Sequence, residues 1–191
     1  IQKFANWFSY YGNRNRAMIA GMTRSMADIR NMTVGYFTLK DRPATVAMYD
    51  MNSTTGKADL YTSMMGLPAS GVTPNLHAVD HIGRQFQRTD DAAPVQNACQ
   101  KNAGMLFTDG FSNEGSPGAP AITGLGVPFD PTPKDSMAAI ATRYYLNTNG
   151  SIGSAGASNL RTGTRFPAGK VSVPHACSTL STDSIEWKRL D

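Results

Sequence analysis

The sequence predicts an α/β fold, a mostly parallel sheet flanked by helices. Two observations support this prediction: several segments repeat apolar residues every three or four positions, and short apolar or β-branched runs lie between them. Alternating helices and strands are typical of α/β domains, whose sheets bind ligands at the carboxyl ends of their strands. The chain has 191 residues, enough for one substantial domain.

The N-terminal part predicts two helices separated by two strands. A first helix is expected over 3–30, with most of its aromatic residues in the core and Tyr10 facing outward. Strands are expected over 33–39 and 44–50, where β-branched and aromatic residues gather, and a short helix over 57–66. The apolar residues at helical spacing in the first helix are Phe4, Trp7, Phe8, Tyr11, Met18, Ile19, Met22, Met26 and Ile29.

A further helix is expected to begin at Thr73 and Pro74, because Thr is a good cap and Pro is favoured at the first helical position. Its buried stripe is predicted to consist of Leu76, Val79, Ile82 and Phe86. The apolar run "AGMLFTD", residues 103–109, predicts a short strand covered on both faces.

The last predicted helix covers 135–147 and is expected to be capped by Asp135. Its inward residues are predicted to be Met137, Ile140, Ala141, Tyr144 and Tyr145. The organisation expected is therefore a core over 1–147, followed at 148–191 by a Gly/Ser-rich extension or a set of long loops of the same domain. The opening "IQKFANWF" reads as an interior sequence, so we expect a piece of a longer protein.

Composition and charge exclude some functions. The net charge is +4, but the basic residues are spread out and form no run with interleaved aromatics, so nucleic-acid binding is not predicted. No apolar stretch reaches the roughly 20 residues of a membrane span. Only 17% of the residues are charged while Gly is abundant, a composition that suits a secreted or surface protein.

Thr73 and Asp109 form the candidate metal site. One helix and one strand separate them, which in an open α/β sheet places their two loops at the same edge. Hydroxyl and carboxylate oxygens suit a small hard cation such as Mg²⁺. Each residue also has a purely structural interpretation, since Thr73 can cap the helix and Asp109–Gly110 can form a turn.

Four blocks of the sequence resemble one family. "GVTPNLHAVDHIG" and "MLFTDG" look like the second and third motifs of a von Willebrand factor A-type domain. Together with "FANWFSYYGNR" and "DSMAAIATRYYL", and in the same order, they resemble the N-terminal region of PilC/PilY-type adhesins of the type IV pilus tip. The resemblance covers about 3–146 and a tail segment. It implies a von Willebrand A-like, Rossmann-like domain that lacks its first strand here and is incomplete at both ends.

The resemblance implies a secreted protein at the pilus tip or bacterial outer membrane surface, acting by binding rather than catalysis. Its partners would be minor pilins, other pilus proteins and a host or abiotic surface, in pilus assembly, attachment and twitching motility. A divalent cation, Mg²⁺ or Ca²⁺, would be held by Thr73, Asp109 and an Asp-x-Ser-x-Ser motif that lies upstream of Ile1 in the family. Val72 replaces the family's second Gly, and Asp50–Thr54 is interpreted as a turn rather than that motif.

Other interpretations stay open. The chain could be a generic A-type ligand-binding module unrelated to pili, or an α/β hydrolase using His77 or His81 as its base. His77 and His81 lie four residues apart on the predicted helix, a spacing that can bind zinc. The third ligand and the general base of a zinc protease are missing, so both histidines are expected to face solvent. The resemblance implies that Cys177 pairs with a cysteine beyond Asp191 and that Cys99 pairs outside the chain or stays free; two reduced buried cysteines are the alternative.

Overall fold

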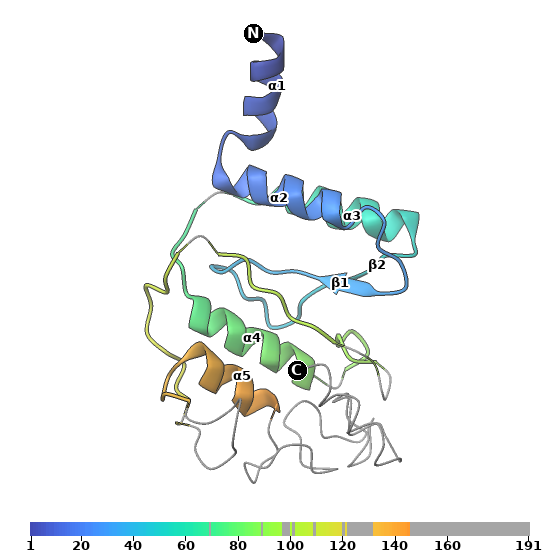
Figure 1. Ribbon diagram of the computed structural model, residues 1–191. Coiled ribbons are helices and arrows are strands. Elements are labelled where there is room, and N and C mark those ends of the chain that lie inside the picture. The colour runs from blue at the N-terminus through green and yellow to red at the C-terminus, as the bar shows by residue number, and fades with distance from the viewer. Residues whose placement is uncertain are drawn as a thin grey trace, which may run out of the picture. The chain divides into compact units, whose positions relative to one another are not determined.

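The computed structural model combines five helices with a two-stranded sheet in the part of the chain that it describes (Figure 1). This confirms the expected mixture of helix and sheet. The contacts divide the chain into two compact units, one made of Ile1–Tyr36 and Ala47–Gly71, the other of Phe37–Val46 and the residues from Val72 onward. The described residues, with the side chains of Tyr10 and Tyr145 excepted, are 1–68, 70–88, 90–96, 100, 102–108, 110–119, 121 and 132–145.

The first unit begins with two helices, α1 (Gln2–Tyr11) and α2 (Arg14–Ser25), so the prediction of one helix over 3–30 is wrong. The break has a local cause. Asn13 adopts an extended conformation, and its side chain accepts a hydrogen bond from the backbone N–H of Arg16 at 2.8 Å. An asparagine in this position is a strong helix start signal, and it begins a new helix inside an otherwise continuous apolar pattern.

The aromatic residues of α1 do not enter a core in the described structure, contrary to the prediction. Phe4, Trp7, Phe8 and Tyr11 are 68%, 54%, 57% and 41% exposed. They form one stripe along the helix and contact each other, with the Phe4 and Trp7 ring centroids 6.0 Å apart. Helical spacing correctly places them on one face, but none of the described residues covers that face.

The sheet of the described residues pairs β1 (Thr33–Gly35) with β2 (Met48–Asp50) in antiparallel register, Val34 opposite Tyr49. Both strands are shorter than predicted, because 37–46 leaves them to join the second unit. Helix α3 (Thr54–Met65) follows, and the Ser53 hydroxyl caps it by accepting the Gly56 N–H at 3.1 Å.

The core of the first unit lies where α2, α3 and the sheet meet. Its buried members are methionine, leucine and isoleucine side chains, and Val34, Tyr36 and Tyr49 pack against them. The predicted inward residues of the second half of the 3–30 segment are therefore in part confirmed. The buried residues of this core are Ile19, Met26, Met51, Leu60 and Met64.

The described helices of the second unit are α4 (Asn75–Gln87) and α5 (Met137–Tyr145), which pack against each other (Figure 1). Gly83 of α4 makes this close contact possible, since a Cβ atom there would lie 2.2 Å from Cδ2 of the Tyr144 ring. The core contains Ala119, Ala139, Ile140 and Tyr144, with the α4 residues Leu76 and Val79 packed against it.

The predicted face of α4 is only partly correct. Leu76, Val79, Ile82 and Phe86 are half-buried rather than buried. The residues that are buried instead include several polar ones, because 37–46 packs on the helix at His81 and Gln85 and α5 packs on it at Asp80 and Gly83. These residues are Asn75, Ala78, Asp80, His81, Gly83 and Gln85.

The cap of α5 also differs from the prediction. Ser136, not Asp135, caps the helix, since its hydroxyl accepts the N–H of Ala139 at 3.1 Å. Asp135 has a positive φ of 58° and turns its carboxylate toward the preceding loop, where it accepts the N–H of Ala119 at 2.8 Å. This backbone hydrogen bond lowers the pKa of Asp135.

The inward face of α5 is predicted correctly at two positions and wrongly at two. Ile140 and Tyr144 are buried, at 0% and 7% exposed. Met137 and Ala141 are exposed, and Ala139 and Thr142 take the inward positions because the helix is rotated relative to the predicted face. The side chain of Tyr145 lies outside the description.

The predicted strand over 103–109 is wrong for the residues that the structure describes. Residues 102–108 run without pairing to any other described strand. Gly104 passes close to α4, since a Cβ there would lie 2.5 Å from Cγ2 of Ile82, while Met105 and Phe107 are 74% and 44% exposed. A continuous apolar run does not distinguish a strand from an irregular segment packed on a helix.

Candidate functional site

The loop that carries Thr73 contacts the residues that follow the apolar run "MLFT". The Thr73 N–H donates to Oδ1 of Asn113 at 2.8 Å, and the Asn113 N–H donates to the Thr73 carbonyl at 3.1 Å. A third bond joins the Asn75 side-chain amide to the Gly110 carbonyl at 2.9 Å. Two loops more than 30 residues apart in sequence are thus held together by three hydrogen bonds.

Thr73 does not cap α4, contrary to the structural interpretation of this residue. Pro74 occupies the N-cap position, with φ −85° and ψ 64°, and no side chain caps the helix. The Thr73 carbonyl instead accepts two backbone hydrogen bonds, one from the N–H of Asn75 at 3.0 Å and one from the N–H of Asn113 at 3.1 Å. Its hydroxyl therefore has no capping role that would account for a Thr at this position.

Asp109 lies outside the described residues, so the predicted proximity of its carboxylate to Thr73 stays a prediction. The residues on either side are described. Thr108 Oγ1 accepts the N–H of Gly110 at 3.3 Å and donates to the Gly110 carbonyl at 3.1 Å. Among the residues that the structure describes, no cluster of three or more His, Cys, Asp or Glu side chains could hold a metal ion.

A buried polar atom next to Thr73 tests whether this region suits a cation. Asn75 is 3% exposed, and while its amide nitrogen is bonded to Gly110, its Oδ1 atom has no hydrogen-bond partner. An unsatisfied buried acceptor costs about 1–3 kcal/mol. The Asn75 amide oxygen and the Thr73 hydroxyl are both oxygen donors of the kind that a hard cation prefers. The positive end of the α4 dipole opposes a cation, so carboxylates such as Asp109 would be needed.

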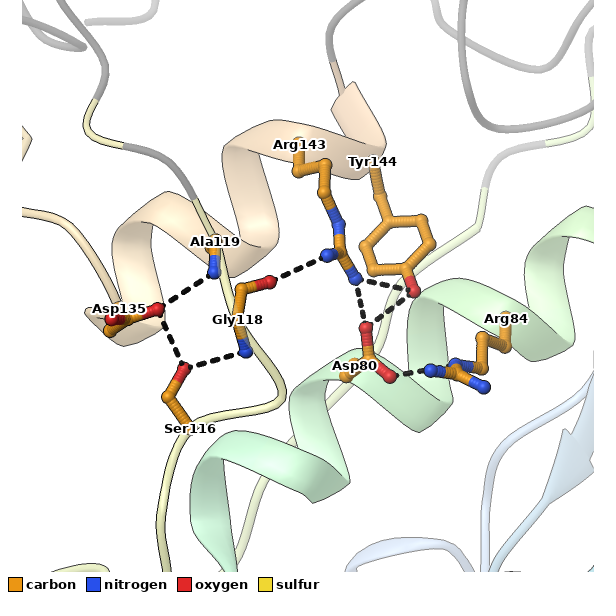
Figure 2. A network of polar contacts seen from close by, with 8 residues as sticks. All are labelled: Asp80, Arg84, Ser116, Gly118, Ala119, Asp135, Arg143 and Tyr144. Carbon is orange, nitrogen blue, oxygen red and sulfur yellow. Dashed lines mark hydrogen bonds and ion pairs between the residues drawn. The ribbon is translucent and has the colours of Figure 1, made fainter.

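A second polar cluster joins α4 to α5, and sequence reasoning missed it (Figure 2). Asp80, only 4% exposed, accepts from Nε of Arg84 at 2.7 Å and from the Tyr144 hydroxyl at 2.6 Å, and it pairs with Arg143. The Asp80 carboxylate raises the pKa of Arg84, and burial raises the pKa of the Tyr144 hydroxyl. The Asp80–Arg84 spacing of four residues could have been read from the sequence, whereas the contribution of α5 could not.

Arg143 also connects this cluster to the loop before α5. Its Nη1 atom donates to the Gly118 carbonyl at 2.8 Å. Figure 2 shows that loop held from its other side by Asp135, which accepts from the Ser116 hydroxyl at 3.3 Å as well as from Ala119. The loop over 116–119 is therefore fixed to α5 by hydrogen bonds at both ends of the helix.

The histidines of α4 differ from each other, and the prediction that both face solvent is wrong for His81. His77 is half-buried, but His81 is 9% exposed. The Phe37 ring meets the His81 ring edge-on with centroids 4.6 Å apart. Burial is the largest cause that lowers the pKa of His81, followed by the nearby Arg42 and Arg84, while Asp80 and the Pro43 backbone act in the opposite direction.

Gln85 fixes 37–46 on α4 beside His81. Its Oε1 accepts the Val46 N–H at 3.1 Å, and its Nε2 donates to the Ala44 carbonyl at 3.0 Å. The same Nε2 atom lies 3.3 Å from Nε2 of His81. Gln85 can donate to this imidazole nitrogen only while the nitrogen is unprotonated. The contact therefore depends on a neutral His81.

The stability of the second unit should fall as the pH decreases below about 6.5, the ordinary pKa of histidine. Because the pKa of His81 is lowered in the folded state, the unfolded chain binds a proton at a higher pH than the folded chain does. The contribution of a neutral His81 is thus complete above about pH 6.5 and is lost as the pH falls toward the folded pKa. Urea unfolding at pH 7.5 and pH 5.5 measures it. His81→Gln should reduce the difference in unfolding free energy between the two pH values, and His77→Gln should preserve it. The same difference in both variants would contradict the assignment of the pH dependence to His81.

Both cysteines, Cys99 and Cys177, lie outside the described residues, so their predicted pairing stays a prediction. None of the described helices is long and apolar enough to cross a membrane.

Comparison with known proteins gives no relative from which function could be transferred. No family model, no curated protein and no solved structure matches the chain.

Proposed function

We propose that the chain is the ligand-binding part of a von Willebrand A-like domain in a PilC/PilY-type pilus-tip adhesin. The observation that carries the proposal is the contact between the Thr73 loop and residues 110–113, through hydrogen bonds of 2.8 Å and 3.1 Å. Both loops belong to blocks on which the family resemblance rests, and an adhesion site of this type requires them to be adjacent. The mostly parallel sheet is part of the same proposal.

The proposed site binds a partner rather than transforming it. The Thr73 hydroxyl and the Asp109 carboxylate would hold a Mg²⁺ or Ca²⁺ ion, completed by oxygen ligands from the Asp-x-Ser-x-Ser motif of the family. When bound, the cation supplies an electrophilic centre that accepts a carboxylate of the partner. Two features support this role: the Thr73 hydroxyl is not used as a helix cap, and the adjacent Asn75 carries an unsatisfied oxygen.

The residues of the chain contribute position and charge. Two hydrogen bonds to Asn113 hold the Thr73 backbone and a third joins Asn75 to Gly110, so the hydroxyl is presented from a held segment. Asp109 supplies the negative charge that offsets the positive end of the α4 dipole. The partners would be minor pilins and a host or abiotic surface, and the protein would act outside the cell in attachment and twitching motility.

Substitutions in the bacterium that produces the protein test the proposal. Thr73→Val and Asp109→Ala should each reduce cation-dependent surface attachment by about tenfold or more, the effect of losing one charge-assisted or metal-directed contact of about 1.5–3 kcal/mol. Attachment is counted in Mg²⁺ and again in EDTA.

Thr73→Ser keeps the hydroxyl and is the matched control, expected to preserve attachment. Pilus number is measured in parallel by electron microscopy, which separates a binding defect from an assembly defect. Attachment that is equal in Mg²⁺ and EDTA, or unchanged by Asp109→Ala, would contradict the proposed function.

A further inference from the structure

An open depression of about 410 Å³ lies over the polar cluster that joins α4 to α5. The described residues that line it are Arg84 and Gln87 from α4 and Arg143 and Tyr144 from α5. The four described lining residues belong to the second unit, and none of these four lies in the Thr73 loop. Two guanidinium groups, an amide and a phenol around one hollow make a surface suited to a polar, negatively charged group.

The chemistry of the depression follows from how Asp80 is placed. This carboxylate is buried, with 5% of its side chain exposed, and it faces the guanidinium groups from inside the helix pair (Figure 2). Asp80 contacts Arg84 through Nε, while 66% of the Arg84 side chain remains exposed. Most of the Arg84 side chain therefore remains accessible to a ligand while its Nε atom holds the guanidinium beside Asp80.

The structure favours a carboxylate over a phosphate as the group bound there. The terminal edge of a guanidinium presents two parallel N–H donors, whose spacing matches the two oxygens of a carboxylate. Asp80, Arg84 and Arg143 carry formal charges of −1, +1 and +1, so the cluster has a net charge of +1, which one carboxylate neutralises.

We propose that this depression binds a carboxylate, with Arg84 as the group that contacts it and the buried Asp80 as the residue that orients Arg84. This site is separate from the proposed cation site and carries the opposite preference for charge. A protein with both could engage an acidic partner at two points. The proposal does not depend on the proposed function, because it rests only on α4, α5 and the depression between them.

Titration of the protein with sodium acetate, followed by the NMR signals of the arginine Nε–H groups, tests the proposal. Acetate should shift the Arg84 signal in a saturable manner, and sodium chloride at equal ionic strength should not. Arg84→Gln should weaken binding by about tenfold or more, as loss of a charged hydrogen bond implies. Arg84→Lys, which keeps the charge but not the paired donors, should also bind acetate more weakly than the unaltered protein.

Arg24→Gln removes the same charge from an exposed position on α2 and is the control, expected to leave acetate binding unchanged. Circular dichroism of each variant confirms that the fold is kept. A Glu-containing hexapeptide and its Gln counterpart identify the source of the carboxylate: tighter binding of the Glu peptide than of acetate indicates an acidic partner protein, and equal binding indicates a small organic acid. Equal, non-saturating shifts with acetate and chloride, or Arg84→Gln binding acetate as well as the unaltered protein, would overturn the proposal.

Discussion

Gly83→Ala lowers the free energy of unfolding by about 2 kcal/mol, the usual cost of inserting a methyl group into a closely packed contact. The added Cβ would lie 2.2–2.4 Å from three atoms of the Tyr144 ring, including Cγ, so the whole ring must move. Elsewhere in a helix the same change stabilises by up to about 1 kcal/mol, because Ala is the better helix former. The sign of the effect therefore reports the contact between α4 and α5, and urea unfolding measures it.

Gly21→Ala is the matched control for this prediction. Gly21 lies in α2, and no atom lies within 4 Å of the position that its Cβ would take. The variant should be as stable as the unaltered protein or more stable, by up to about 1 kcal/mol. If Gly83→Ala were stabilising to the same extent as Gly21→Ala, Tyr144 would not pack on Gly83 in solution.

Asp80→Asn should be the most damaging change of a polar residue, lowering the free energy of unfolding by about 2–3 kcal/mol. The carboxylate accepts from Arg84 and the buried Tyr144 hydroxyl and pairs with Arg143, and a neutral amide of the same shape cannot satisfy these donors. The loss is smaller than for a fully buried ion pair, because the Arg84 side chain is 66% exposed and can be solvated.

Double-mutant cycles measured by urea unfolding separate the two arginines. Coupling between Asp80 and Arg143 should exceed coupling between Asp80 and Arg84, since the Arg143 side chain is 32% exposed and the Arg84 side chain 66% exposed. Negligible coupling between Asp80 and Arg143 would show that this ion pair does not join the two helices.

The local elements of the fold could be predicted from the sequence where a short pattern determines them. Helices α3, α4 and α5 lie where apolar residues recur at helical spacing, and the two strands lie inside the predicted β-branched runs. The caps were harder to assign. Ser136 and Asp135 are both good cap residues, and only the positive φ of Asp135 shows that its carboxylate serves the preceding loop.

The features that depend on distant residues could not be predicted from spacing. The buried face of α4 includes His81 and Gln85 because 37–46 packs on that side, and nothing in the helix sequence indicates such a cover. Asp80 and Arg84 are four residues apart, a spacing typical of ion pairs on an exposed helix surface, yet Asp80 is buried because Arg143 and Tyr144 approach it from α5. In both cases a polar residue is buried with its partners, which hydrophobic periodicity does not reveal.

The candidate site shows the same division. The expectation that the Thr73 loop lies next to the residues following "MLFT" came from element order, and the hydrogen bonds to Gly110 and Asn113 agree with it. The capping role of Thr73 was expected from residue preference alone, and it is wrong because Pro74 takes the cap position. The two segments are adjacent although residues 102–108 form no strand in the described part of the chain, whereas the role of the Thr73 hydroxyl depends on the backbone turn at Pro74.

Paramagnetic broadening by Mn²⁺ tests whether the Thr73 loop and residues 110–113 form a cation-dependent binding site. Mn²⁺ is added in small amounts to ¹⁵N-labelled protein, and the amide signals are followed. Selective broadening is expected at Thr73, Asn75, Gly110 and Asn113, and Asp109→Ala should abolish it. Broadening that spares both loops, or that persists unchanged in Asp109→Ala, would contradict the proposed cation-dependent site.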